Sequence, residues 1–403
     1  MQTTERLYFT DSSLLQFPAT IIDVRATERG YEVQLDRTAF YPTGGGQPND
    51  TGLLGDARVI DVFENDDGVI YHVVSQLGAL APGQSVEGRI DRARRLDHLQ
   101  QHSGQHILSQ AFVHACRAET RSFHLGAQSS TIDIELQTPT SEQMHAAEEI
   151  ANEIIFEDRP MRVHLLSEEE AQRLPLRKET PLRGQIRVIE VEGYDYSPCG
   201  GTHAARAGQI GLIAIKGFER AKKMTRVEFV CGHRALEEYR AANSIAATVA
   251  QLFSAERDAS VELVRRAIQE NKSLKRRIRD LLELAMTAEA AEMSAQATST
   301  GQFKIIQATF DGRDLEEVRM LATKIVQAEP AIALLGTKDA GAARLIFARS
   351  ASLTENMGQL LAEACQVLGG RGGGKPDMAQ GGGPDVAKLD EAIKLAAEKI
   401  QNQ

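Results

Sequence analysis

Four side chains in two distant segments have the types and the spacing of metal ligands. His102 and His106 lie four positions apart in QQHSGQHILSQ, and Cys199 and His203 lie four positions apart in SPCGGTHAARAG. Residues four apart on a helix project from one face, so both imidazoles of the first pair can reach one ion. Because zinc prefers nitrogen and sulfur donors, we expect one Zn²⁺ site formed by both pairs.

The two glycines between Cys199 and His203 are expected to aim both ligands at one point. Gly200 and Gly201 remove side-chain bulk and permit positive φ, so the loop can turn tightly. Four protein ligands are typical of a closed structural zinc, whereas a catalytic zinc usually keeps three and a water. The spacing alone leaves both kinds of site open.

The other cysteines and histidines are weaker candidates. Cys231 and His233 lie two positions apart at the end of a predicted strand, and we interpret the pair as structural. Cys116 follows an apolar helix face and is expected to be a core thiol. His98 lies one turn before His102 and is expected behind the ligands or at the surface.

The composition is that of a globular protein. Hydrophobic residues make up 42% of the chain and charged residues 25%. No apolar run approaches the ~20 residues that a membrane span needs, and the first residues lack the pattern of a secretory signal. Four cysteines in 403 residues do not make a disulfide framework, so we expect a cytoplasmic protein without a membrane partner. The net charge of -10 argues against indiscriminate nucleic-acid binding but leaves a local basic groove open.

Apolar and polar residues alternate in the first part of the chain. In residues 1–95 this pattern, with turns at Arg29-Gly30 and Asp67-Gly68, predicts a small antiparallel sheet or barrel. Residues 96–232 combine a helix that begins near Arg92 with strands on both sides of the cysteine loop, at 186–191 and 225–230. We therefore expect a β-rich domain followed by an α+β domain that contains the zinc.

The second half of the chain changes in character. Residues 233–298 lack proline and are rich in Ala, Leu, Glu and Arg, which predicts long helices, as an extended pair or a coiled coil. Their basic stretch RRAIQENKSLKRRIRD is interpreted as a solvated helix face, with partner packing and RNA contact as alternatives. Residues 299–403 alternate strands and helices, which predicts a small α/β domain and an overall α+β class.

Residues 369–383, GGRGGGKPDMAQGGG, are rich in glycine. They begin like a phosphate-binding loop, but Pro376 replaces the Ser or Thr that ligates Mg²⁺ and a helix is predicted before them, so we reject an NTPase. We expect a glycine-rich surface where backbone approaches RNA and where Arg371 and Lys375 meet phosphate. Acidic residues slightly outnumber basic ones in residues 301–403, so the contact must be a local patch, and a dimer surface is the alternative.

Three motifs, in this order, resemble the editing domain of alanyl-tRNA synthetase. They are FYPTGGGQPNDTG (40–52), QQHSGQH (100–106) and CGGTH (199–203), and the glycine-rich 369–383 resembles the DHH-associated domain that ends many of these synthetases. The likeness covers nearly the whole chain and is greatest to the freestanding alanyl-tRNA editing proteins of the AlaX type, in their long form. The family's synthetases carry a large N-terminal ATP-dependent domain, and the motifs here begin so early that we expect no adenylate chemistry.

The resemblance implies that zinc is bound by His102, His106, Cys199 and His203. It also implies hydrolysis of the ester that joins serine or glycine wrongly to the 3′ end of tRNA(Ala). A pocket shaped for alanine rejects a ligand that differs by one small group by only ~1–3 kcal/mol, so a second sieve is needed. The expected mechanism is metal-assisted, with zinc positioning the terminal ribose, polarising the ester carbonyl or activating a water.

Thr43, Gln47 and Asp195 are the first candidates for catalytic groups, and Asp133 is an alternative to Asp195. Thr43 resembles the family's residue that reads the serine hydroxyl, and Gln47 would donate to the ester or orient a water, with ordinary turn chemistry as the alternative for both. Asp195 is a candidate general base, as is Asp133, and both could instead hold the zinc ligands through hydrogen bonds.

The resemblance places further residues and partners. Arg121 and His124 lie where the family has a substrate-facing segment. The C-terminal domain would hold the body of the tRNA, and a homodimer through the helical or C-terminal region is a further expectation. The alternative function is a tRNA- or RNA-binding protein with a purely structural zinc. A phosphoesterase of the DHH type is disfavoured because the sequence has no Asp-His-His triplet.

Overall fold

A computed structural model describes residues 4–177, 184–297, 299, 301–339 and 341–402. These residues form two compact units, Met1–Val249 and Ala250–Gln403, each of which is considered by itself. No helix in the described part of the chain combines the length and the apolar character that crossing a bilayer requires. Short 3-10 helices lie at Leu7–Phe9, Ala207–Ile210, Arg257–Ala259 and Val386–Lys388.

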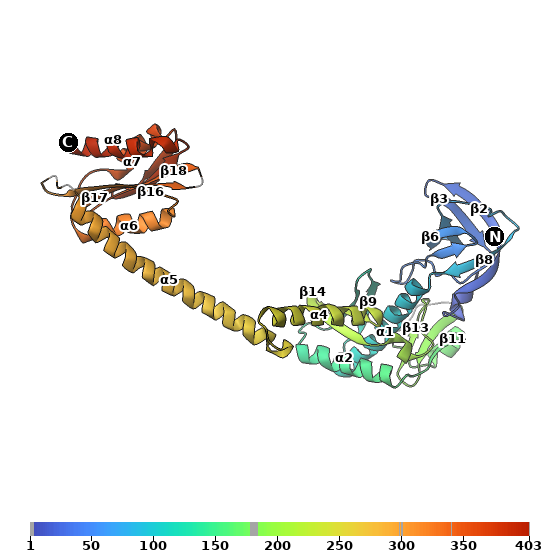
Figure 1. Ribbon diagram of the computed structural model, residues 1–403. Coiled ribbons are helices and arrows are strands. Elements are labelled where there is room, and N and C mark those ends of the chain that lie inside the picture. Colours follow the sequence, from blue (N-terminus) through green and yellow to red (C-terminus); the bar gives the residue numbers. More distant parts are fainter. Residues whose placement is uncertain (1–3, 178–183, 298, 300, 340, 403) are drawn as a thin grey trace. The chain divides into compact units, whose positions relative to one another are not determined.

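The first unit begins with a closed antiparallel barrel (Figure 1). In barrel order its strands are β2 (Gln16–Thr27), β3 (Gly30–Leu35), β7 (Ile70–Val74), β6 (Ala57–Glu64), β5 (Gly52–Leu54) and β8 (Ser85–Ile90), and β1 (Glu5–Arg6) pairs with β4 (Arg37–Thr38) beside it. On β2, Phe17, Ala19 and Ile21 alternate with more exposed residues and enter the barrel core. Alternating apolar residues thus form the inner face, and the predicted barrel is confirmed.

Helix α1 (Arg92–Cys116) follows the barrel and carries the first ligand pair. Asp91 begins the helix by accepting hydrogen bonds from the backbone N–H groups of Ala93 and Arg94. Arg117, at a φ of 55°, ends it in the left-handed conformation. Its middle is buried all round, which explains why polar residues there bond to neighbouring elements rather than to water.

Two antiparallel sheets and two further helices complete the α+β part of this unit. One sheet has the order β14 (Ile213–Ala221), β15 (Met224–Cys231), β10 (Ser130–Ile134) and β9 (Thr120–Leu125). The other has the order β11 (Met161–Leu166), β12 (Ile186–Val191) and β13 (Asp195–Pro198), and the helices are α2 (Ser141–Phe156) and α3 (Glu168–Gln172). One core joins α1, α2 and the two sheets, since Phe112 of α1, Ile154 of α2, Val227 of β15 and Val191 of β12 belong to one buried cluster. The predicted strands on both sides of the cysteine loop are β12 and β15.

Two long helices occupy most of residues 233–298, as predicted. They are α4 (His233–Leu252) and α5 (Ser260–Gln296). Near its end, α5 buries Met286 and Ala290 in a core that it shares with α6 (Leu315–Ala328) of the second unit. The division of the chain at residues 95, 232 and 298 and the coiled coil stay predictions.

The C-terminal part of the second unit is a mixed sheet with helices on both faces (Figure 1). The strand order is β16 (Lys304–Asp311), β17 (Ala331–Asp339), β18 (Ala342–Arg349), β20 (Met378–Gly383) and β19 (Arg371–Gly374), and only β16 and β17 are parallel. One core contains α7 (Met357–Val367) and α8 (Leu389–Gln401), and the other contains α6 and the end of α5.

The glycine-rich segment 369–383 forms the last strand pair of this sheet, which its composition did not predict. A Cβ on Gly372 would lie 2.4 Å from Cδ2 of Leu361 and 2.7 Å from Sγ of Cys365 on α7. Some of these glycines therefore serve the close approach of a strand to a helix, rather than an exposed surface.

Candidate metal centre

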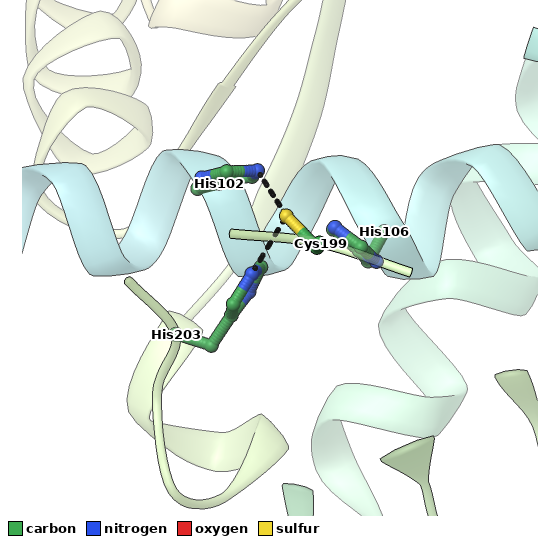
Figure 2. A group of neighbouring side chains, drawn as sticks. All are labelled: His102, His106, Cys199 and His203. Atoms are coloured by element: carbon green, nitrogen blue, oxygen red, sulfur yellow. Dashed lines mark hydrogen bonds between the residues drawn. The ribbon is translucent and has the colours of Figure 1, made fainter. Parts of the chain in front are cut away.

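The four predicted ligands lie together (Figure 2). His102 and His106 extend from α1, and Cys199 and His203 come from the loop after β13. Their ligand atoms all lie within 4.8 Å of one another. Sγ of Cys199 is 3.4 Å from Nε2 of His102 and 3.3 Å from Nε2 of His203. The group can hold one metal ion that all four residues contact at once.

The electrostatics at Cys199 and His203 favour the metal-binding forms of these two residues. Burial raises the pKa of the Cys199 thiol, but interaction with His102 and His203 outweighs burial and brings the pKa well below its ordinary value. Burial lowers the pKa of His203 well below its ordinary value. Metal ions bind thiolate and neutral imidazole, so both shifts favour the forms that coordinate.

Gly201 is required for a reason other than the one the sequence suggested. Neither Gly200 nor Gly201 is among the described residues with positive φ, so that expectation was wrong. Instead, a Cβ on Gly201 would lie 2.1 Å from Cε1 of His102, whereas a Cβ on Gly200 would meet no atom within 4 Å. The loop passes directly over the His102 ring, and only glycine leaves room at that point.

Gln47 holds His102 and the cysteine loop together. Its Oε1 lies 2.8 Å from Nδ1 of His102 and accepts a hydrogen bond from the backbone N–H of Thr202 at 3.2 Å. Its Nε2 donates to Oγ1 of Thr202 at 2.8 Å. Both ends of this buried amide are therefore occupied by protein groups. The contacts orient the imidazole, as a hydrogen bond to the second ring nitrogen does at metal sites.

Asp195 lies beside His106 at a longer distance, and among the described residues Nδ1 of His106 has no hydrogen-bond partner. Its Oδ2 lies 3.6 Å from Nδ1 of His106, and the carboxylate accepts hydrogen bonds from Nε of Arg177 at 3.0 Å and Oγ of Ser197 at 2.8 Å. Burial lowers the pKa of His106, but Asp195 and Cys199 outweigh burial and raise it. Asp195 is thus a buried carboxylate beside the His106 ring, held in place by Arg177 and Ser197.

A cavity of about 210 Å³ lies beside the ligands. His102, His106 and Cys199 line it, and in the described part of the chain His203 does not. The other lining residues include Gly45, Gln105, Thr120, Arg121, Phe123 and Arg177. The cavity thus reaches three of the four residues of the ligand group.

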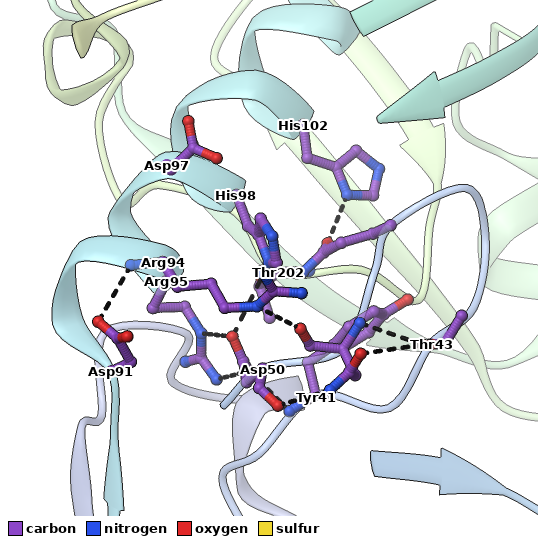
Figure 3. Close-up of polar contacts among 12 residues, drawn as sticks. Tyr41, Thr43, Asp50, Asp91, Arg94, Arg95, Asp97, His98, His102 and Thr202 are labelled. Carbon is purple, nitrogen blue, oxygen red and sulfur yellow. Dashed lines mark hydrogen bonds and ion pairs between the residues drawn. The ribbon is translucent and has the colours of Figure 1, made fainter. Parts of the chain in front are cut away.

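Thr43 lies on the glycine turn and is exposed (Figure 3). Its Oγ1 accepts a hydrogen bond from the backbone N–H of Asn49 at 3.1 Å. Gly45 and Gly46 have φ of 56° and 83°, so the expected tight bend is present. Gly45 lines the cavity, whereas among the described residues Thr43 does not.

The other candidates are placed at different distances from the cavity. Arg121 lines it and pairs with Glu135 at 2.7 Å, whereas His124 is exposed and is not among its described lining residues. Asp133 accepts hydrogen bonds from Arg226 and does not reach the ligand group. In the second unit, Arg371 of β19 and Lys375 just after it are both exposed.

The remaining cysteines and His98 have structural surroundings. Cys231 is buried, and its backbone exchanges two hydrogen bonds with the side chain of Gln101. Sγ of Cys116 donates to the carbonyl of Phe112. His98 is only 3% exposed, so it lies behind the site rather than at the surface.

A buried network that no sequence pattern predicted joins the barrel to the loop. Arg95 and Asp50 form an ion pair at 2.5 Å with both side chains buried (Figure 3). Arg95 also donates to the carbonyl of Ser12, whose Oγ accepts a hydrogen bond from the backbone N–H of His203 at 3.2 Å. His203, a candidate metal ligand, is thus held by Ser12, nearly two hundred positions earlier in the chain. The periodicity and spacing of the sequence do not reveal this contact.

Comparisons with known proteins agree with this organisation. Three family models match the chain: "tRNA synthetases class II (A)" at residues 7–94, "Threonyl and Alanyl tRNA synthetase second additional domain" at 186–228 and "DHHA1 domain" at 302–402. The fold and the ligand group therefore define a protein built from domains that tRNA synthetases also use.

Two curated relatives match along nearly the whole chain. An alanine–tRNA ligase of Methanoregula boonei is 32% identical over 98% of this chain and 43% of the ligase. The alanyl-tRNA editing protein AlaX-L of Pyrococcus horikoshii is 28% identical over 99% of this chain and 98% of that protein. Among solved structures, the C-Ala domain from Aquifex aeolicus alanyl-tRNA synthetase is also similar. The match includes 26% of this chain and 97% of the C-Ala domain, with 28% sequence identity and a TM-score of 0.25.

The chain spans less than half the length of such ligases and nearly the whole length of AlaX-L. It belongs to the same family as the freestanding alanyl-tRNA editing proteins of the AlaX type and the corresponding domains of alanyl-tRNA synthetase.

Proposed function

We propose that this protein is a hydrolase that acts in trans on tRNA(Ala) carrying serine or glycine, with a zinc ion bound by His102, His106, Cys199 and His203. The observation that carries the proposal is the cavity beside these ligands, which three of them line. A purely structural zinc needs no such opening. The family supplies the substrate class, because its freestanding member is an alanyl-tRNA editing protein. Such a protein would act where tRNA is charged, in the cytoplasm.

The donor set and its distances favour zinc. Sulfur and nitrogen atoms bound tetrahedrally to one zinc ion, at about 2.3 Å and about 2.0–2.1 Å, lie about 3.5 Å apart. The distances from Sγ of Cys199 to Nε2 of His102 and His203, 3.4 and 3.3 Å, are close to that value. One thiolate and three imidazoles suit zinc better than Mg²⁺ or Ca²⁺, which prefer oxygen.

We assign roles to the chain's own residues from their contacts. Gln47 orients the His102 ring and Asp195 orients the His106 ring. Both therefore act as positioning residues and do not act by contact with the substrate. When bound, zinc would polarise the ester carbonyl or lower the pKa of a water. Thr43, on the glycine turn next to the cavity-lining Gly45, would read the serine hydroxyl by a hydrogen bond that alanine cannot make.

The second unit would hold the body of the tRNA. Arg371 and Lys375 are exposed at the edge strand β19, where the glycine backbone leaves room for phosphate to approach. If they contact phosphate, Arg371→Ala with Lys375→Ala weakens tRNA binding and reduces its salt dependence, whereas Lys394→Ala on α8 does neither.

The proposal is tested by deacylation of Ser-tRNA(Ala), Gly-tRNA(Ala) and Ala-tRNA(Ala) by the zinc-loaded protein. We expect one or both mischarged tRNAs to be hydrolysed and Ala-tRNA(Ala) to be spared, and we expect Cys199→Ala to lose this activity. A zinc-loaded protein that binds tRNA but hydrolyses none of the three esters would instead be an RNA-binding protein with a structural zinc.

A further inference from the structure

Arg187 of β12 holds the cysteine loop from behind. Its Nη1 donates to the carbonyls of Cys199 at 2.7 Å and Gly201 at 2.9 Å, which lie on either side of Gly200. The backbone bonds in the other direction, since the N–H of Cys199 donates to the carbonyl of Arg187 at 3.1 Å. One nitrogen thus draws together two carbonyls of the ligand loop and fixes its curvature between Cys199 and His203.

The Arg187 side chain also contacts the N-terminal segment of the first unit, at Phe9. Nε of Arg187 donates to the carbonyl of Phe9 at 3.1 Å, and the guanidinium lies 5.3 Å from the centre of the Phe9 ring. The planar fork is needed for this arrangement, because its donors point in fixed and different directions. A lysine has one nitrogen in place of these separately directed donors, so we expect it not to reproduce all three contacts.

The burial of this cation is unusual for a merely structural arginine. Arg187 is 6% exposed, and among the described residues its hydrogen-bond partners are three backbone carbonyls and no carboxylate. An unpaired buried charge is costly. Its place directly behind Cys199, which binds metal as an anionic thiolate, gives the charge a counterpart within the site.

We propose that Arg187 is the positioning residue of the metal centre's sulfur ligand: it sets the direction of Cys199 relative to His203 and ties that direction to Phe9 of the N-terminal segment. The inference rests on the proposed metal site. It assigns to Arg187 no contact with substrate and no proton transfer.

Cobalt(II) tests the inference, because Co²⁺ takes zinc's place and its thiolate charge-transfer and d–d absorption bands report the sulfur ligand and the coordination geometry directly. The full-length wild type, Arg187→Lys and Cys199→Ala are stripped of metal and titrated with Co²⁺ against a chelator. Arg187→Lys should bind Co²⁺ about tenfold or more weakly, the range typical of residues that orient a ligand. Its charge-transfer band should be weaker or shifted relative to wild type, and Cys199→Ala should lack that band.

Arg349→Lys is the matched control. Arg349 of β18 likewise donates to two backbone carbonyls, those of Glu355 at 2.7 Å and Ser350 at 3.0 Å, but it lies in the second unit. The Arg349→Lys variant should have the same Co²⁺ affinity and the same absorption spectrum as the wild type. If Arg187→Lys loses its helical circular dichroism, Arg187→Gln, which removes the charge and keeps an NH₂ donor, takes its place with the same expectation.

The outcomes separate this inference from the proposed function. A wild type that binds no Co²⁺ at these four residues contradicts the metal site itself. A wild type that binds Co²⁺, with an Arg187→Lys variant that matches it in affinity and spectrum, overturns only the role of Arg187. Unfolding of both Arg187 variants also overturns that role, because the residue would then maintain the fold rather than the loop.

Discussion

Oε1 of Gln47 and Nδ1 of His102 lie 2.8 Å apart, although the glycine turn and helix α1 that carry them belong to different parts of the first unit. The contact fixes which imidazole nitrogen is left for the metal, since the ring must donate through Nδ1 to the amide oxygen and coordinate through Nε2. The barrel's glycine turn is thereby part of the metal centre.

Loss of this contact should weaken metal binding. Gln47→Ala removes the acceptor for Nδ1 of His102 and leaves the Thr202 hydroxyl without its partner. We expect zinc affinity to fall by about 10- to 100-fold. Competition with a chelator measures it, and Gln76→Ala, on an exposed part of the barrel, is the control. Unchanged zinc affinity in Gln47→Ala would mean that the contact does not support the ligand.

The two adjacent glycines of the loop provide a second, internally controlled prediction. Gly201→Ala places a Cβ against the His102 ring, whereas Gly200→Ala points into open space. We therefore expect Gly201→Ala to lose zinc affinity by more than about tenfold, because His102 must move, and Gly200→Ala to keep it. Zinc content after dialysis against a chelator distinguishes them. Equal behaviour of the two variants would contradict the close approach of the loop to His102.

Thr43 tests the proposed discrimination between amino acids. Thr43→Val keeps the shape of the side chain and removes its hydroxyl, so the rate ratio for Ser-tRNA(Ala) over Ala-tRNA(Ala) should fall by about 10- to 200-fold, the equivalent of ~1–3 kcal/mol. Thr43→Ser keeps the hydroxyl and should retain the ratio. Single-turnover deacylation measures both. Retained selectivity in Thr43→Val would assign Thr43 to the turn alone, where it accepts a hydrogen bond from Asn49.

The grouping of the four candidate ligands could be predicted from the sequence because cysteine and histidine are rare in this chain and two pairs share a spacing that suits one ion. The barrel and the long helices could be predicted because their patterns are local. Arg187 and Ser12 could not, because their partners are backbone atoms brought close only by the fold. The sequence suggested that Gly201 is needed for a positive φ, whereas the structure shows that it leaves room for the His102 ring. The sequence does not reveal that His102 lies against Gly201.

His72 gives the barrel a dependence on pH. It is fully buried between Oγ1 of Thr38 and the carbonyl of Val33, and burial lowers its pKa from 6.5 to about 4. The unfolded chain, with the ordinary pKa, binds this proton first as the pH falls. Neutral His72 therefore makes its full contribution to the free energy of unfolding above pH 6.5. About 3 kcal/mol of this free energy is lost as the pH falls to about 4.

Thermal unfolding between pH 7 and pH 4 checks this dependence. His72→Gln, which cannot take up the proton, should show a smaller fall in Tm over this range than the wild type. The exposed His145→Gln should follow the wild type. A wild-type slope in His72→Gln would assign the loss of stability to other groups.

A zinc titration of activity tests most directly whether one zinc at the four ligands makes this protein an editing hydrolase. The protein is stripped of metal, zinc is added back in fractions of an equivalent, and deacylation of Ser-tRNA(Ala) is followed at each step. We predict a rate that rises linearly and levels off at one zinc per chain, with Ala-tRNA(Ala) spared throughout. Activity that survives complete removal of the metal, or an inert protein with one zinc bound, would contradict this prediction.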